Sequence, residues 1–157
     1  LNAGTNVQTF SWNGTNAQRW SFVQLDNYNG VNVSEGVYTI QSAANNAYVL
    51  DIDNASTNSG ANVQLFNSNN TAAQKFSIKS VGDGYYKIQC EATGKVLDVS
   101  DGSMASNANV QQFSWNGSAA QCWKFVDAGN GNYYIQSKLG TVLDIQNYRN
   151  RTGVSVK

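Results

Sequence analysis

The chain has 157 residues, the size of one ordinary domain, and its ten basic and ten acidic side chains give a formal net charge of zero. Because these charges cancel, the chain lacks the basic surplus that binds nucleic acid or an anionic membrane surface. Charged residues make up 13% of the chain and hydrophobic residues 41%, and no apolar run approaches the roughly 20 residues of a membrane helix. It contains no histidine, which excludes every His-dependent triad, acid–base pair and metal site.

Short boxes of sequence recur along the chain, between turns rich in Asn and Gly, of which there are 22 and 14. In chain order they are AGTNVQTF from Ala3, QRW ending at Trp20, GVYTIQS from Gly36, VLD ending at Asp51, GANVQLF from Gly60, QKF ending at Phe76, GYYKIQC from Gly84, VLD ending at Asp98, NANVQQF from Asn107, QCW ending at Trp123, GNYYIQS from Gly131 and VLD ending at Asp144. The VLD boxes end 47 and 46 residues apart. Such regular spacing is typical of an internal repeat.

The boxes follow one another in a permuted order. Residues 36–78 and 84–125 each hold a complete repeat, residues 131–157 hold only a first half, and residues 1–27 hold only a second half. We therefore expect residues 1–157 to form one domain, in which the front of the chain completes the last repeat. Exchange of this half repeat between two molecules is the alternative topology.

An insertion separates the front half repeat from the first complete one. Trp20 and Tyr38 are 18 residues apart, whereas the equivalent gaps, Phe76 to Tyr86 and Trp123 to Tyr134, are 10 and 11 residues. The surplus falls within residues 24–35 and resembles a junction between domains. The chain is therefore either a window cut from a tandem array or a permuted single domain.

Each box predicts one short strand, because apolar and polar residues alternate in it with period two. Tyr38 and Ile40 share one face of their strand, and Leu50 and Ile52 share one face of the next. Four strands in each of three repeats give twelve, separated by turns at the spacing typical of all-β folds. No segment has the apolar stripe of an amphipathic helix. We predict an all-β chain with pseudo-threefold symmetry.

The three ordered boxes (VLD, NVQxF and Q-x-W/F) resemble the ricin-type β-trefoil lectin repeat, in a variant similar to bacterial carbohydrate-binding modules. This resemblance covers nearly the whole chain. It implies a β-trefoil that binds glycans without catalysis or cofactor and tethers a larger secreted or cell-surface bacterial protein. A galactose-type sugar is the first ligand to test. Because a fold does not fix a function, a structural or inhibitory trefoil that binds a protein partner is the alternative.

Alternation also places a polar cluster on the outer side of each repeat. Asp51 points away from Leu50 and Ile52, and Gln64 and Phe66 lie on the corresponding face of the following strand. A carboxylate accepts hydrogen bonds from neighbouring sugar hydroxyls, an amide both donates and accepts, and an aromatic ring packs on the apolar face of a pyranose. These are the groups that a sugar pocket needs.

The resemblance assigns three pockets to matching residues. They are Asp51, Gln64 and Phe66; Asp98, Gln111 and Phe113; and a composite of Asp144 with Gln8 and Phe10. The same Asp residues would also suit tight turns after a strand, and the three Phe rings would also suit packing beneath a loop. Both alternatives stay open at the level of sequence.

The chain departs from the family at one pocket position. Ala17, Ala73 and Ala120 stand where members of the family often carry Asn before the Gln of the last box. Loop residues could compensate, namely Trp12 with Asn13 and Trp115 with Asn116, which favours the second and third pockets over the first. The Gln residues themselves (Gln18, Gln74 and Gln121) alternate in phase with the core aromatic, so we expect them to satisfy buried backbone groups.

Catalysis and metal binding find little support. The carboxylates recur in three equivalent frames with no second repeating carboxylate to form an acid–nucleophile pair, and no calcium loop follows Asp51 and Asp53. Cys90 and Cys122 lie on the first and last strands of one repeat. An extracellular setting would favour a disulfide between them, but sequence does not give their separation.

Overall fold

The computed structural model describes residues 1–25 and 35–148. Its strands are β1 (Val7–Phe10), β2 (Trp20–Gln24), β3 (Gly36–Ser42), β4 (Tyr48–Ile52), β5 (Val63–Asn67), β6 (Phe76–Gly82), β7 (Tyr85–Cys90), β8 (Val96–Val99), β9 (Ala108–Phe113), β10 (Trp123–Gly129), β11 (Asn132–Ser137) and β12 (Val142–Ile145). Five 3-10 turns lie between them: η1 (Asn16–Gln18), η2 (Asp53–Ala55), η3 (Ala72–Gln74), η4 (Ser100–Gly102) and η5 (Ala119–Gln121). The prediction of an all-β chain with twelve strands is confirmed. Among the described residues no helix is long and apolar enough to cross a membrane.

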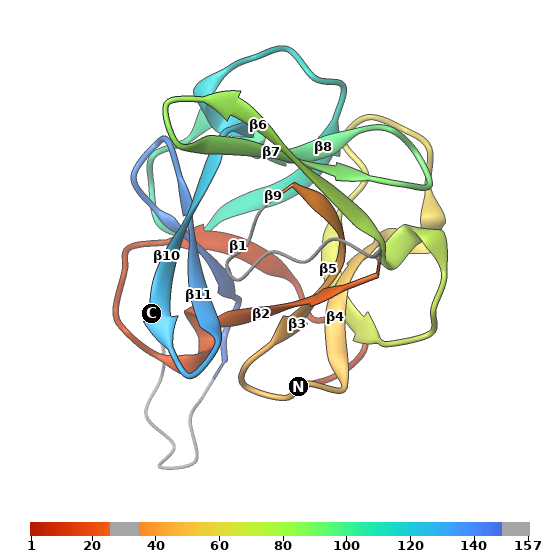
Figure 1. Cartoon of the computed structure of the whole chain (residues 1–157), viewed down its shortest axis with the longest axis vertical. Coiled ribbons are helices and arrows are strands. Elements are labelled where there is room, and N and C mark those ends of the chain that lie inside the picture. The colour runs from red at the N-terminus through yellow and green to blue at the C-terminus, as the bar shows by residue number, and fades with distance from the viewer. Residues whose placement is uncertain (26–34, 149–157) are drawn as a thin grey trace.

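Half of the strands close into a barrel (Figure 1). Antiparallel pairing runs from β2 through β3, β6, β7, β10 and β11 and returns from β11 to β2. The hairpins β6–β7 and β10–β11 each contain a bulge near the turn, which increases the local twist that a closed sheet requires. Closure leaves these strands without free edges.

The other strands form three antiparallel pairs, and they position the candidate sites. In β4–β5 Asp51 lies directly opposite Gln64, in β8–β9 Asp98 lies opposite Gln111, and in β12–β1 Asp144 lies opposite Gln8. The third pair is formed by the first and last strands of the described chain. Directly opposed residues of an antiparallel pair have neighbouring side chains, so each register brings one carboxylate to one amide.

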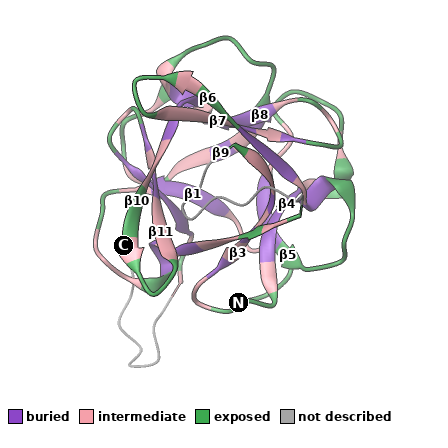
Figure 2. Cartoon of the chain, viewed as in Figure 1, coloured by how far each residue is buried: buried purple, intermediate pink, exposed green. Residues whose placement is uncertain are grey.

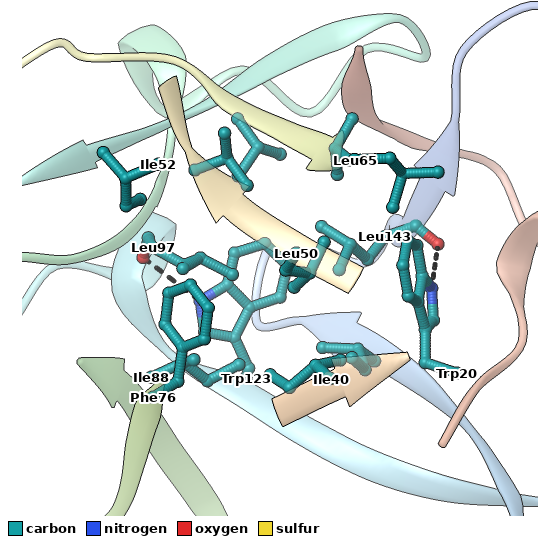
Figure 3. Packing of buried hydrophobic residues seen from close by; sticks show 14 of the residues in the cluster. Trp20, Ile40, Leu50, Ile52, Leu65, Phe76, Ile88, Leu97, Trp123 and Leu143 are labelled. Carbon is teal, nitrogen blue, oxygen red and sulfur yellow. Dashed lines mark hydrogen bonds between the residues drawn. The ribbon is translucent and has the colours of Figure 1, made fainter. Parts of the chain in front are cut away.

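The barrel strands and the three strand pairs both contribute buried residues to the core (Figure 2). Each repeat contributes equivalent residues that are fully buried: Trp20, Phe76 and Trp123; Ile40, Ile88 and Ile135; and Leu50, Leu97 and Leu143. Trp20 and Trp123 each donate an indole Nε1–H to a backbone carbonyl, of Leu143 and Leu97 respectively, at 3.2 Å (Figure 3). Full burial of one such side chain is worth about 1.5–3 kcal/mol, so the threefold core is the main stabilising feature.

A ring of asparagines links the three repeats. Asn6 donates its amide to Asn109 at 2.9 Å, Asn109 donates to Asn62 at 2.8 Å, and Asn62 donates to Asn6 at 2.7 Å. These are the Asn residues of the three NVQ boxes. Each amide is thus both donor and acceptor in a closed cycle, which satisfies half-buried polar groups where the repeats meet.

Parts of the predicted organisation fall outside the described residues. The predicted domain junction at residues 24–35 is described only at 24–25 and 35. The predicted last half repeat, 131–157, is described only as far as residue 148.

Candidate functional site

The most open candidate site lies on the second repeat, where two amides hold the carboxylate of Asp98. Gln111 Nε2 donates to Asp98 Oδ1 at 3.1 Å, and Gln121 Nε2 donates to Asp98 Oδ2 at 2.8 Å. Asp98 is only 6% exposed. Its carboxylate points away from the apolar core, as predicted. It nevertheless lies at the bottom of a depression, because the two amides cover its sides.

Gln121 connects this carboxylate to the adjoining loop. Its Nε2 also donates to the carbonyl of Ser114 at 2.9 Å, and its Oε1 accepts the backbone N–H of Asn116 at 2.7 Å. As predicted, the Gln of the last box satisfies backbone groups, although these hydrogen bonds, with Ser114 and Asn116, are only partly buried. Its bond to Asp98 was not predicted, although the constant Gln-x-aromatic box is the signal that marks the residue.

The depression is a cavity of about 460 Å³ whose lining includes Asp98, Gln111, Phe113, Asn116 and Ala120. The ring of Phe113 is 39% exposed. Asn116 Oδ1 accepts the N–H of Ser118 at 2.9 Å, and within residues 1–25 and 35–148 its Nδ2 has no hydrogen-bond acceptor. The cavity thus combines an anionic acceptor, an available donor and an exposed ring, and its size lies in the range of small-molecule sites.

The first repeat has the same arrangement in a smaller cavity of about 250 Å³. Gln64 Nε2 donates to Asp51 Oδ1 at 3.1 Å, and Gln74 Nε2 donates to Asp51 Oδ2 at 2.9 Å. Phe66 and Asn69 line the cavity in the places that Phe113 and Asn116 take in the second repeat. Two of the three predicted residue sets therefore come together around a cavity.

The third set comes together differently. Gln8 Nε2 donates to Asp144 Oδ2 at 2.8 Å, so the predicted composite pair of the chain's two ends does form. Asp144, however, is completely buried. Burial raises the pKa of Asp144 to about 6, although hydrogen bonds from Gln8 and Gln18 favour its ionised form.

The third repeat has a large side chain beside its set. Three residues after the LD carboxylate each repeat has a left-handed residue (Asn54, Asp101 and Asn147). The residue that follows is Ala55 or Gly102 in the two cavity linings, but it is Tyr148 in the third repeat, where it packs against the core. The expectation that the third pocket outranks the first stays a prediction, and the complete burial of Asp144 does not favour it.

The two loop tryptophans lie at the surface. Trp12 is 62% and Trp115 38% exposed, which confirms that both are at least partly exposed. Trp115 is not among the residues that line the second-repeat cavity. Its ring instead contacts the Nζ of Lys87, which lies 5.0 Å from the ring centroid. The ring centroids of Trp12 and Tyr134 are 5.9 Å apart, and the two rings are nearly perpendicular. Sequence predicted the exposure of these rings but not the direction in which they point.

Both cysteines are free and buried, contrary to the suggested disulfide. Trp123 on β10 lies opposite Tyr86 on β7, a register that puts Cys122 beside Lys87. Cys90 is three residues farther along β7, or about 10 Å at 3.3 Å per residue, beyond the roughly 7 Å that a disulfide spans between Cα atoms. Among the described residues there is also no group of three or more carboxylates or thiols that could hold a metal ion.

Comparisons with known proteins agree with this architecture. A family described as ricin-type beta-trefoil lectin domain-like matches residues 2–66, 16–113 and 72–157. The chain is similar to ThreeFoil, a designed 3-fold symmetric protein, with 29% identity over 76% of this chain and 94% of that one and a TM-score of 0.65. A search of curated proteins finds no match.

Two further solved structures contain a similar unit. In the exo-beta-1,3-galactanase 1,3Gal43A from Clostridium thermocellum the identity is 29% over 62% of this chain, with a TM-score of 0.58. The Polyporus squamosus lectin, bound to the epitope Neu5Aca2-6Galb1-4GlcNAc, is 21% identical over 78% of this chain, with a TM-score of 0.62. The match spans 24% of the galactanase and 48% of the lectin, so the chain corresponds to one part of each.

Proposed function

Because the chain belongs to the family of ricin-type β-trefoil lectin-like domains, we propose that it is a carbohydrate-binding module without catalytic activity of its own. The observation that carries the proposal is the Asp98–Gln111 pair, which lies at the bottom of an open cavity beside the exposed ring of Phe113. A fixed carboxylate, an amide and a ring are the groups that orient a pyranose.

Each residue has a distinct role in this proposal. Asp98 accepts hydrogen bonds from two adjacent hydroxyls, since an ionised carboxylate has about four acceptor positions and the two amides use only part of them. The unpaired Nδ2 of Asn116 donates to a hydroxyl oxygen, and Phe113 packs on the C–H face of the ring. Gln121 does not touch the sugar; it positions Asp98 and the loop of Asn116.

The first repeat supplies a second pocket with Asp51, Gln64 and Phe66. Single sugar pockets are weak, and two on one domain raise avidity towards a polysaccharide without any new contact. We propose that residues 1–27 complete the repeat of residues 131–157 within the same molecule and that the domain tethers a larger secreted or cell-surface protein to glycans. A galactose-type sugar is the first ligand to test.

The positions of the carboxylates in the two cavities do not support hydrolysis as their function. A second carboxylate lines each one, but it is Asp101 in the second repeat and Asp53 in the first, three and two residues after the LD carboxylate. A glycosidase needs two carboxylates at a fixed separation across the bond that is cleaved, and no common pair recurs here.

The proposal is tested by a binding screen against galactosides, xylan, other plant polysaccharides and host glycans. Wild type is compared with Asp98→Asn, Asp51→Asn and Asp144→Asn, because Asn keeps the shape and removes the charge. We expect Asp98→Asn to lose most of the binding, Asp51→Asn to lose avidity, and Asp144→Asn, whose carboxylate is buried, to bind like wild type. Absence of binding at millimolar ligand would favour the alternative, a trefoil that binds a protein partner.

A further inference from the structure

Beside the second-repeat cavity, two lysines converge on one tyrosine. Lys138 Nζ lies 5.1 Å from the centroid of the Tyr85 ring, and Lys124 Nζ lies 5.8 Å from it. The residues come from β7, β10 and the end of β11, which are neighbours in the barrel (Figure 1). Two ammonium groups are thus held near one ring on the outer face of the barrel.

The fold does not require this arrangement, because the other two repeats lack it. The positions of Tyr85, Lys124 and Lys138 are occupied by Val37, Ser77 and Glu91 in one repeat and by Asn132, Ser21 and Ala43 in the other. The first of these sets lines a cavity of about 310 Å³, whose lining also includes Glu35 and Lys79. Two lysines beside one ring are therefore a feature of the second repeat and not of the fold.

Among the described residues these lysines form no ion pair. Within the parts of the chain that the structure describes, no carboxylate pairs with Lys87, Lys124 or Lys138. Lys87 lies two residues from Tyr85 on β7, on the same face, and directly opposite Lys79 of β6. Like charges opposite one another are unfavourable unless an anion lies between or near them.

This group of residues (Tyr85, Lys87, Lys124, Lys138 and Trp115), the lysine–aromatic cluster, adjoins the candidate sugar pocket. Trp115, on which Lys87 lies, directly precedes Asn116 of the cavity lining. Lys138 directly precedes Leu139, another residue of the same lining. The rim of the cavity therefore continues into a surface that offers positive charge and aromatic rings.

We propose that the lysine–aromatic cluster binds the anionic group, a carboxylate or a sulfate, of a saccharide whose neighbouring sugar occupies the second-repeat cavity. This inference rests on the proposed function and names its substrate class, acidic glycans. The rings of Tyr85 and Trp115 hold the lysine ammonium groups, and the lysines supply point charges that do not distinguish a carboxylate from a sulfate.

The test compares three oligosaccharides of equal length by titration calorimetry: a neutral galactose oligomer, a galacturonic acid oligomer and a sulfated galactose oligomer. Wild type should bind one or both acidic oligomers about tenfold more tightly than the neutral one at low salt, and the advantage should shrink at high salt. Exposed charge pairs contribute about 0.2–1 kcal/mol each, so Lys124→Ser and Lys138→Ala should each remove up to about fivefold of it. The acidic oligomer that binds shows whether the anion is a carboxylate or a sulfate.

The variants carry the residues of the neutral repeat and so suit the fold. Lys95→Ser, which removes the same charge outside the cluster, is the matched control and should keep the full preference. Equal affinity of wild type for acidic and neutral oligomers would overturn the inference. A preference for acidic oligomers that Lys124→Ser and Lys138→Ala retain would also overturn it, and so would an equal loss of this preference in Lys95→Ser. Binding of the neutral oligomer reports separately on the pocket: if it persists while the acidic preference is absent, only this inference fails, and if no oligomer binds, both proposals fail.

Discussion

Replacing Gln121 by leucine tests the link between the loop and the carboxylate of the second repeat. The side chain is fully buried and makes three hydrogen bonds, to Asp98, Ser114 and Asn116. Leucine has a similar volume and no polar atoms. The substitution therefore removes the hydrogen bonds while it keeps most of the packing.

The expected loss of stability follows from these bonds. A neutral hydrogen bond contributes about 1 kcal/mol and one to a charged group about 1.5–3 kcal/mol, so two neutral bonds and one to the Asp98 carboxylate amount to about 4 kcal/mol. For a domain of this length each kcal/mol lowers the melting temperature by about 3 °C. Gln121→Leu should thus melt about 12 °C below wild type.

The assay is thermal unfolding followed by near-UV circular dichroism, with sugar affinity measured on the same samples below the transition. Gln136→Leu is the control, because Gln136 is half-buried and donates one long hydrogen bond of 3.5 Å. It should melt within about 3 °C of wild type. A melting temperature of Gln121→Leu no lower than that of Gln136→Leu would refute the reasoning.

Three further predictions concern charge, the asparagine ring and the thiols. The pKa of Asp144 is raised in the folded state, so its contribution to stability is present below about pH 4 and is lost as the pH rises through about 6. In urea denaturation, the free energy of unfolding of wild type should fall by up to about 3 kcal/mol relative to that of Asp144→Asn between pH 4 and pH 7. Free energies of unfolding that change in parallel with pH in the two proteins would contradict this. Asn62→Ala breaks the asparagine ring at two bonds and should lower the free energy of unfolding by about 2 kcal/mol; an unchanged denaturation midpoint would count against it. Burial raises the pKa of the Cys90 and Cys122 thiols, so a thiol reagent should label both in denatured protein and neither in native protein, and a denatured protein that takes up no label would show a disulfide instead.

Period-two alternation within a repeat was enough to predict which side chains face each other. It placed Asp51 and Gln64 on one face of adjacent strands, and their register shows that they are directly opposite. The complete burial of Asp144 was beyond this reasoning, because alternation predicts the face of a strand on which a side chain lies and not how deeply it is covered.

Contacts between distant elements were the second limit of sequence reasoning. The bond from Gln121 to Asp98 joins a 3-10 turn to a strand 23 residues away, and alternation within a strand carries no information on it. Likewise Cys90 lies on β7 and Cys122 directly precedes β10, which pairs with β7, but their positions along β7 differ by about 10 Å, which only the register reveals. The lysine–aromatic cluster also depends on the barrel, since two strands, β7 and β10, and the segments that follow β9 and β11 bring its residues together.

The central claim, that the second-repeat cavity binds a sugar, is tested most directly by titrating isotope-labelled protein with galactose and following the amide signals by NMR. The account predicts saturable shifts of the side-chain amides of Gln111, Asn116 and Gln121, smaller shifts of Gln64 and Gln74, and none of Gln8. Saturable shifts confined to residues outside the two cavities, or no shifts with galactose or any other sugar of the screen at millimolar concentration, would contradict it.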